Sequence, residues 1–70
     1  MSALRVMPKS SEQKERWMDF FQKHGFQIES KDGFTFDVTD WNPDRLGLDV
    51  RVEYSRLLGK YPCSMQIVRW

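Results

Sequence analysis

Residues 10–25 constrain the fold more than any other segment, because they hold the beginning, the apolar face and the end of an amphipathic helix. Ser10 is a suitable N-cap, and Gln13 follows it at the spacing of a capping box. Gly25 stands where the residue after a helix commonly takes a positive φ. Between these ends, one stripe repeats at helical spacing through Trp17, Phe20, Phe21 and His24. The sequence therefore predicts a helix over residues 10–24, with one face that can cover a sheet.

Residues 26–38 alternate between apolar and polar side chains on both sides of Lys31-Asp32-Gly33, as two strands of a hairpin do. A two-residue Asp-Gly turn would place apolar side chains opposite charged ones on the same face. A three-residue loop over 31–33 avoids this and gives Gly33 the positive φ that such a loop needs. The predicted pairs are Phe26 with Val38, Ile28 with Phe36 and Ser30 with Phe34.

The second half of the chain contains the longest alternation, over residues 48–54, and a shorter one over residues 63–67. Opposing these two runs pairs apolar side chains throughout, with Tyr54 opposite Cys63, Val52 opposite Met65 and Val50 opposite Ile67. We therefore predict a second hairpin over residues 47–69. A loop over residues 39–46 precedes it, because Pro43 cannot donate a ladder hydrogen bond.

The remaining segment, residues 1–9, alternates briefly at Leu4 and Val6 before Pro8, and predicts an irregular arm or an edge strand. A chain of 70 residues makes a single domain, and its 40% hydrophobic and 14% aromatic content supplies a core. The expected fold class is α+β, with one N-terminal helix packed on a small antiparallel sheet of about four strands in two hairpins.

The sequence offers no catalytic or metal-binding site and implies no cofactor. Cys63 and His24 are the only cysteine and histidine, whereas a zinc site needs three or four protein ligands. Cys63 falls on the predicted core face, and His24 suits the carboxyl end of the helix. Asp40, Asn42 and Asp44 have calcium-loop spacing, but the positions that need Gly and Glu both hold arginine. We therefore expect a protein that is not an enzyme.

Charge and cysteine content narrow the setting in which the chain acts. Its 11 Lys and Arg nearly balance 10 Asp and Glu, whereas nucleic-acid binders usually carry a strong basic excess. One cysteine cannot form the internal disulfides that small secreted domains normally need. Residues 1–9 do not resemble a signal peptide, and no stretch approaches the roughly 20 apolar residues of a membrane span. The expected location is the cytoplasm, without membrane contact.

The first function hypothesis is a protein-binding module, such as an inhibitor, adaptor or regulatory subunit of a larger protein. Aromatic side chains in loops and the edges of a sheet are common binding elements. Trp41 is either an exposed anchor or a lid on the core, and a sheet edge also offers a route to a homodimer. The candidate partner-binding residues are Trp41, Asn42, Asp44, Arg45, Tyr61 and Trp70.

The alternative hypothesis is a nucleic-acid-binding domain that uses basic residues of the helix and the N-terminal arm. Its candidate residues are Arg5, Lys9, Lys14, Arg16 and Lys23. Three acidic residues on the same helix dilute their field, and the chain has no motif of a known nucleic-acid-binding class. This hypothesis predicts that the basic residues share one face in the folded chain.

Overall fold

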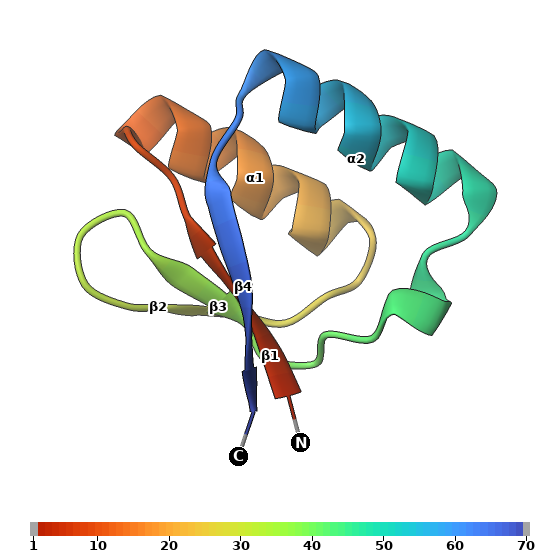
Figure 1. The fold of residues 1–70 in the computed structure, drawn as a ribbon, viewed down its shortest axis with the longest axis horizontal. Helices are drawn as coiled ribbons and strands as arrows, with labels where there is room; N and C mark the ends of the chain where they lie inside the picture. Colours follow the sequence, from red (N-terminus) through yellow and green to blue (C-terminus); the bar gives the residue numbers. More distant parts are fainter. Residues whose placement is uncertain (1, 70) are drawn as a thin grey trace.

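Residues 2–69 fold into two α-helices and four strands in the computed structural model. The elements follow one another as β1 (Ser2–Met7), α1 (Ser11–Lys23), β2 (Ile28–Ser30), β3 (Phe36–Val38), α2 (Leu48–Lys60) and β4 (Ser64–Arg69). The strands form one antiparallel sheet in the order β2-β3-β1-β4. Figure 1 shows the two helices side by side. This is the ferredoxin-like arrangement, and the predicted α+β class with a four-stranded antiparallel sheet is confirmed.

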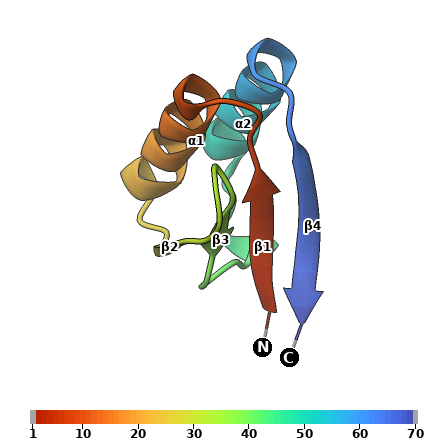
Figure 2. The same cartoon turned by 90° about the vertical axis from the view of Figure 1, so that its left-hand side faces the viewer.

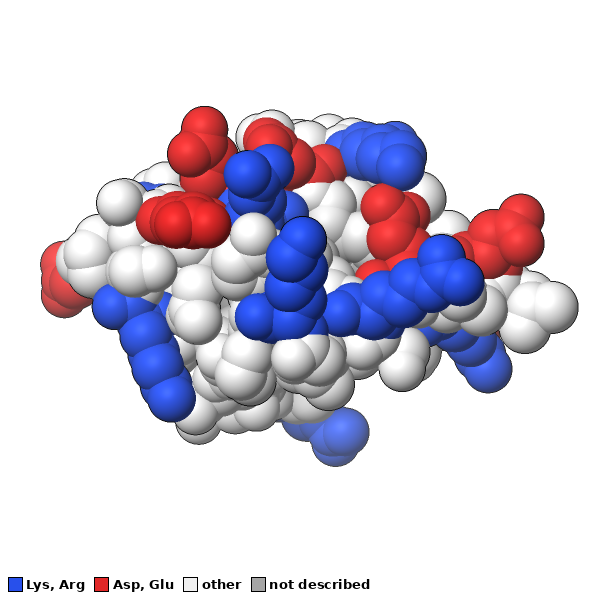
Figure 3. All heavy atoms as spheres, turned by 90° about the horizontal axis from the view of Figure 1, so that it is seen from above, with Lys and Arg blue, Asp and Glu red and all other residues white. Residues whose placement is uncertain are grey.

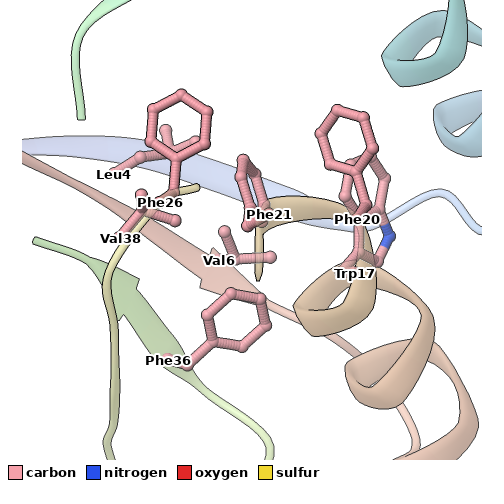
Figure 4. Packing of buried hydrophobic residues seen from close by; sticks show 8 residues of the cluster. All are labelled: Leu4, Val6, Trp17, Phe20, Phe21, Phe26, Phe36 and Val38. Atoms are coloured by element: carbon pink, nitrogen blue, oxygen red, sulfur yellow. The ribbon is translucent and has the colours of Figure 1, made fainter. Parts of the chain in front are cut away.

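The core lies between α1 and the middle of the sheet, where side chains from β1, β3 and α1 interlock (Figure 4). β1 contributes Leu4 and Val6, and it pairs with β3 on one side and β4 on the other. The prediction of an arm or edge strand over residues 1–9 is therefore wrong. The segment takes a central place because its apolar side chains bury on one face while Ala3, only 1% exposed, fits the other face.

The helix predicted over residues 10–24 is confirmed as α1 with its expected ends. The Ser10 hydroxyl oxygen accepts a hydrogen bond from the Gln13 backbone N–H at 3.2 Å. The Gln13 side chain reaches back and accepts from the Lys9 N–H at 2.9 Å. Gly25 has a φ of 82°, as predicted for the residue that ends the helix. Trp17, Phe20 and Phe21 are buried, so the predicted stripe is the core face.

The first hairpin exists, but its predicted register is wrong by two residues. Ile28 pairs with Val38 and Ser30 with Phe36, so the three-residue loop over 31–33 becomes a wider turn over 31–35. A shift of two residues keeps every side chain on its predicted face, which is why the alternation did not resolve it. Gly33 has the expected positive φ, at 61°. Phe26 leaves the ladder and packs in the core instead.

The second hairpin, predicted over residues 47–69, is wrong because residues 48–60 form α2. Val50, Tyr54, Leu57 and Tyr61 recur at helical spacing and pack against the core. Leu48 and Val52, which a strand would have buried beside them, are 78% and 43% exposed. The predicted pairs Tyr54–Cys63, Val52–Met65 and Val50–Ile67 do not form.

The last strand, β4, is confirmed with a different partner. It pairs with β1 over six residues, with Met65 opposite Val6 and Ile67 opposite Leu4. Figure 2 shows β4 at the margin of the sheet beside β1. The loop predicted over residues 39–46 is also confirmed, with a single 3-10 turn at Pro43–Arg45.

A candidate binding groove between the helices

A groove of about 310 Å³ lies between α1 and α2. From α1 it is lined by Arg16, Asp19, Phe20 and Lys23. From α2 it is lined by Glu53, Arg56, Leu57 and Lys60. Both sets repeat at intervals of three or four residues, so each helix presents one side of its surface to the groove. The groove therefore exists because two helices of equal length lie side by side on the sheet.

Phe20 and Leu57 form the apolar floor of the groove. Phe20 is 4% exposed and contacts the ring of Trp17 at 5.9 Å between ring centroids. It also lies 6.1 Å from the ring of Tyr54 on α2, measured between centroids. Leu57 is half-buried and packs against the core. The floor is therefore an extension of the core to the surface.

The rim of the groove carries an excess of positive charge. Glu53 accepts from Lys23 Nζ at 3.1 Å and contacts His24 Nε2 at 2.7 Å. These two hydrogen bonds, that of His24 first, hold the pKa of Glu53 below its ordinary value. Arg16, Arg56 and Lys60 take part in no ion pair within residues 2–69. Figure 3, which views the helical side, shows Lys and Arg side chains gathered across its middle.

An apolar floor below a cationic rim binds a ligand that combines an apolar group with negative charge. Residues 2–69 contain no group of three or more His, Cys, Asp or Glu placed to hold a metal ion.

Cys63 and His24, the two residues considered for catalysis, are not brought together. Cys63 is half-buried against the core, and burial raises the pKa of its thiol while the charge of Lys9 lowers it. Lys9, whose charge acts on Cys63, precedes the start of α1, whereas His24 ends this helix. Cys63 and His24 therefore lie near opposite ends of a helix that spans roughly 20 Å. The His24 ring contacts Glu53 on α2. The last carbonyls of α1 accept from the backbone N–H of His24 and not from its ring.

The predicted binding residue Trp41 is a lid on the core. Its ring lies 6.2 Å from that of Phe21 and 5.8 Å from that of Phe26, measured between centroids, and it remains partly exposed. Arg45 completes this cover, with its guanidinium 4.3 Å from the centre of the Phe26 ring. Arg45 also donates to Asp40 at 2.9 Å and to the Gly25 carbonyl at 3.1 Å. These contacts hold the loop to the end of α1.

The other predicted partner-binding residues lie in separate places. Asn42 accepts from the Asp44 N–H at 3.0 Å, and both residues are exposed in the 3-10 turn. Tyr61 lies at the opposite end of α1 from Trp41, where its hydroxyl donates to Glu12 at 3.4 Å and its carbonyl accepts from Trp17 Nε1 at 2.9 Å. Trp70 lies outside the described residues. The structure does not bring Trp41 and Tyr61 together.

The basic residues considered for nucleic-acid binding divide between two faces. Arg5 lies on the sheet face away from the helices, where its guanidinium makes two hydrogen bonds to Asp37, at 2.9 and 3.1 Å. Lys9 and Lys14 lie near the start of α1, outside the groove. Arg16 and Lys23 line the groove. The expectation that the basic residues share one face is therefore not met.

Sequence reasoning missed the α2 half of the groove. The spacing of Glu53, Arg56, Leu57 and Lys60 is helical, but it has this meaning only once the segment is known to be a helix. Neither helix within residues 2–69 is long and apolar enough to cross a membrane. Comparisons with protein families, curated proteins and solved structures find no match to this chain.

Proposed function

We propose that this chain is a non-enzymatic protein-binding module that takes an acidic segment of a larger protein in the groove between α1 and α2. It would act as an inhibitor, an adaptor or a regulatory subunit. The carrying observation is that Arg16, Arg56 and Lys60, which have no ion-pair partner within residues 2–69, surround the apolar floor. Carboxylates of the segment would meet these cations while one apolar side chain covers Leu57, above the buried ring of Phe20.

The groove replaces the loop aromatics as the proposed contact surface. The ring of Trp41 packs beside those of Phe21 and Phe26, so only part of it is free to contact a partner. Leu57 of α2 instead offers a half-buried apolar side chain at the groove floor, beside the buried ring of Phe20. We place the module in the cytoplasm, because its single cysteine, Cys63, has no internal disulfide partner.

A protein segment suits the groove better than a nucleic acid does. Single-stranded nucleic acids bind by stacking their bases on exposed aromatic faces. Phe20, the aromatic residue of the groove floor, is only 4% exposed and presents no free ring face. Arg5, on the other face, pairs with Asp37, and Lys9 and Lys14 lie outside the groove. A continuous track for phosphates is therefore not part of this surface.

The test is a selection of short random peptides displayed on phage, followed by affinity measurement with the best peptide. We expect the selected peptides to combine Asp or Glu with one large apolar residue. The double variant Arg16→Glu/Arg56→Glu should bind the best peptide about tenfold more weakly or worse, because each reversed contact at a partly exposed site costs about 0.5–1 kcal/mol.

The matched control is Lys9→Glu/Lys14→Glu, which changes the net charge equally but lies outside the groove. Its affinity for the peptide should stay within about twofold of that of the original chain. Equal losses in the two double variants would contradict a defined site and indicate general attraction. A single-stranded DNA oligonucleotide that binds with affinity falling linearly in log salt would favour the nucleic-acid alternative.

A further inference from the structure

We infer that β4 is the interface of a homodimer, in which two copies of the chain pair their β4 strands antiparallel and join their sheets into one. The two-fold axis stands perpendicular to the sheet and passes beside Gln66. Both helical layers then lie on the same side of the joined sheet. The interface is separate from the groove between α1 and α2, so the inference is independent of the proposed function.

The two edges of the sheet are built differently. The β2 edge is three residues long, and its central residue, Glu29, bonds Lys31 at 3.1 Å. Short length and charge are the usual means by which proteins keep an edge from pairing. The β4 edge is six residues long, pairs with β1 in an uninterrupted register, and carries charge only at its last residue, Arg69. Figure 2 shows the free side of β4. The molecule therefore protects one edge and leaves the other open.

The sequence of β4 is complementary to itself about Gln66. An axis there places Met65 of each copy opposite Ile67 of the other, and Ser64 opposite Val68. Met65 and Ile67 both lie on the helical side of the sheet, because they pair with Val6 and Leu4 of β1. Opposed apolar side chains on one face stabilise an antiparallel pair. Ile67, which is 46% exposed, would gain this cover.

The distribution of charged side chains along β4 also favours pairing with a second copy about this axis. Residues 64–68 carry no charged side chain, so no like charges face each other in the pair. The two Arg69 residues stand six residues apart along the joined strands, or roughly 20 Å. An axis at Ile67 would instead place Met65 opposite Arg69 on the same face. An axis at Met65 would leave only three pairs within the strand.

The first test is sedimentation of the purified chain over a range of concentrations. We expect twice the mass of one chain, and a monomer for Ile67→Lys, which places a charge opposite Met65. Val52→Lys is the matched control, because Val52 is an exposed apolar residue of α2 with a similar exposed fraction, 43%. This variant should remain a dimer, and circular dichroism should show both variants folded. A chain that is monomeric at all concentrations would overturn the inference.

The second test fixes the register. In a Cys63→Ala background, Gln66→Cys should form a disulfide between copies under mild oxidation, because the axis brings the two residue 66 Cβ atoms within about 5 Å. Glu15→Cys, exposed on α1, should cross-link far more slowly. Equal cross-linking of the two variants would contradict this axis. If the chain is a monomer and still selects acidic peptides, the dimer inference is wrong and the proposed function of the groove is supported.

Discussion

The two helices have the same length, 13 residues, but they are attached to the molecule in different ways. α1 buries Trp17, Phe20 and Phe21, is capped by a side chain at its start and ends at a glycine with positive φ. α2 has no buried residue and no side-chain cap at Gly47. Its first residue, Leu48, is 78% exposed.

The comparison shows that α1, one wall of the groove, belongs to the core, whereas α2, the other wall, packs on the outside of the core. α1 contributes fully buried side chains to the core, whereas α2 contacts the core through half-buried side chains such as Tyr54 and Leu57. Elements with few buried contacts open at lower free-energy cost than core elements. We therefore expect α2 to be the wall that adjusts to a partner.

The largest expected effect is that of Phe21→Ala, which removes a fully buried ring of α1. Phe21 contacts the rings of Trp17, Phe26, Phe36 and Trp41. We expect a loss of about 3–5 kcal/mol in the free energy of unfolding, a large part of the roughly 4–10 kcal/mol available to a chain of this size. Leu57→Ala in α2 should cost only about 1–2 kcal/mol, because its side chain is half-buried. Urea unfolding followed by circular dichroism measures both.

Equal losses for the two variants would remove the contrast between the helices. If Phe21→Ala does not fold, Phe21→Leu preserves most of the buried volume and should still cost about 1 kcal/mol. This milder variant keeps the comparison measurable on a folded chain.

The next largest effect concerns the end of α1. Gly25→Ala should lower the free energy of unfolding by about 1–2 kcal/mol, because the φ of 82° is strained for a residue with a Cβ atom. Gly25→Asn should cost less, since asparagine tolerates this conformation better. An alanine variant as stable as the original chain would show that the end of α1 can rearrange freely.

The contrast between the helices also explains what the sequence could predict. At α1, the N-cap, the apolar stripe and the closing glycine indicate the same helix that the core selects. At residues 48–54, Val50 and Tyr54 fall on one face in both a strand and a helix. Tertiary structure decides between the strand and the helix, because β1 pairs with β4 and occupies the position that residues 48–54 would take in the second predicted hairpin.

The same limit applies to the register of β2 and β3 and to the groove. A shift of two residues leaves the faces of a strand unchanged, so alternation alone cannot separate pairing of Ile28 with Val38 from pairing with Phe36. The sequence identifies Arg16 and Lys23 as candidate binding cations, but their place in a groove depends on α2. In β2 and β3, local patterns indicated which side chains share a face. Long-range contacts determined what lies opposite them and, over residues 48–54, whether the segment forms a strand or a helix.

A smaller effect of opposite sign is expected in α2. Gly59→Ala should raise the free energy of unfolding by about 0.5 kcal/mol, because alanine favours the helix and loses less backbone entropy on folding. An added Cβ at Gly59 meets no atom within 4 Å. The midpoint of thermal unfolding should rise by about 2–4 °C. A lower midpoint would show that α2 is held by tighter contacts near its end than its exposure indicates.

The smallest effect concerns the link between the two helices at Glu53. Its pKa lies below the ordinary 4.5 because His24 and Lys23 of α1 hydrogen-bond its carboxylate. A carboxylate with a lowered folded pKa stabilises the fold above its unfolded pKa, and this contribution is lost as pH falls through the folded value. Glu53→Gln should therefore cost up to about 0.5 kcal/mol at neutral pH, since the site is partly exposed. Urea unfolding of both chains at a series of acidic pH values measures the difference.

This difference should shrink below about pH 4.5, as the carboxylate of the original chain takes up a proton. Asp19→Asn is the matched control, because Asp19 lines the same groove but makes no ion pair within residues 2–69. A similar acid dependence for Asp19→Asn would mean that the general charge of the groove, and not the Glu53 bridge, connects the helices. A dependence limited to Glu53 would identify this one carboxylate as the charged link between the wall fixed in the core and the wall laid against it.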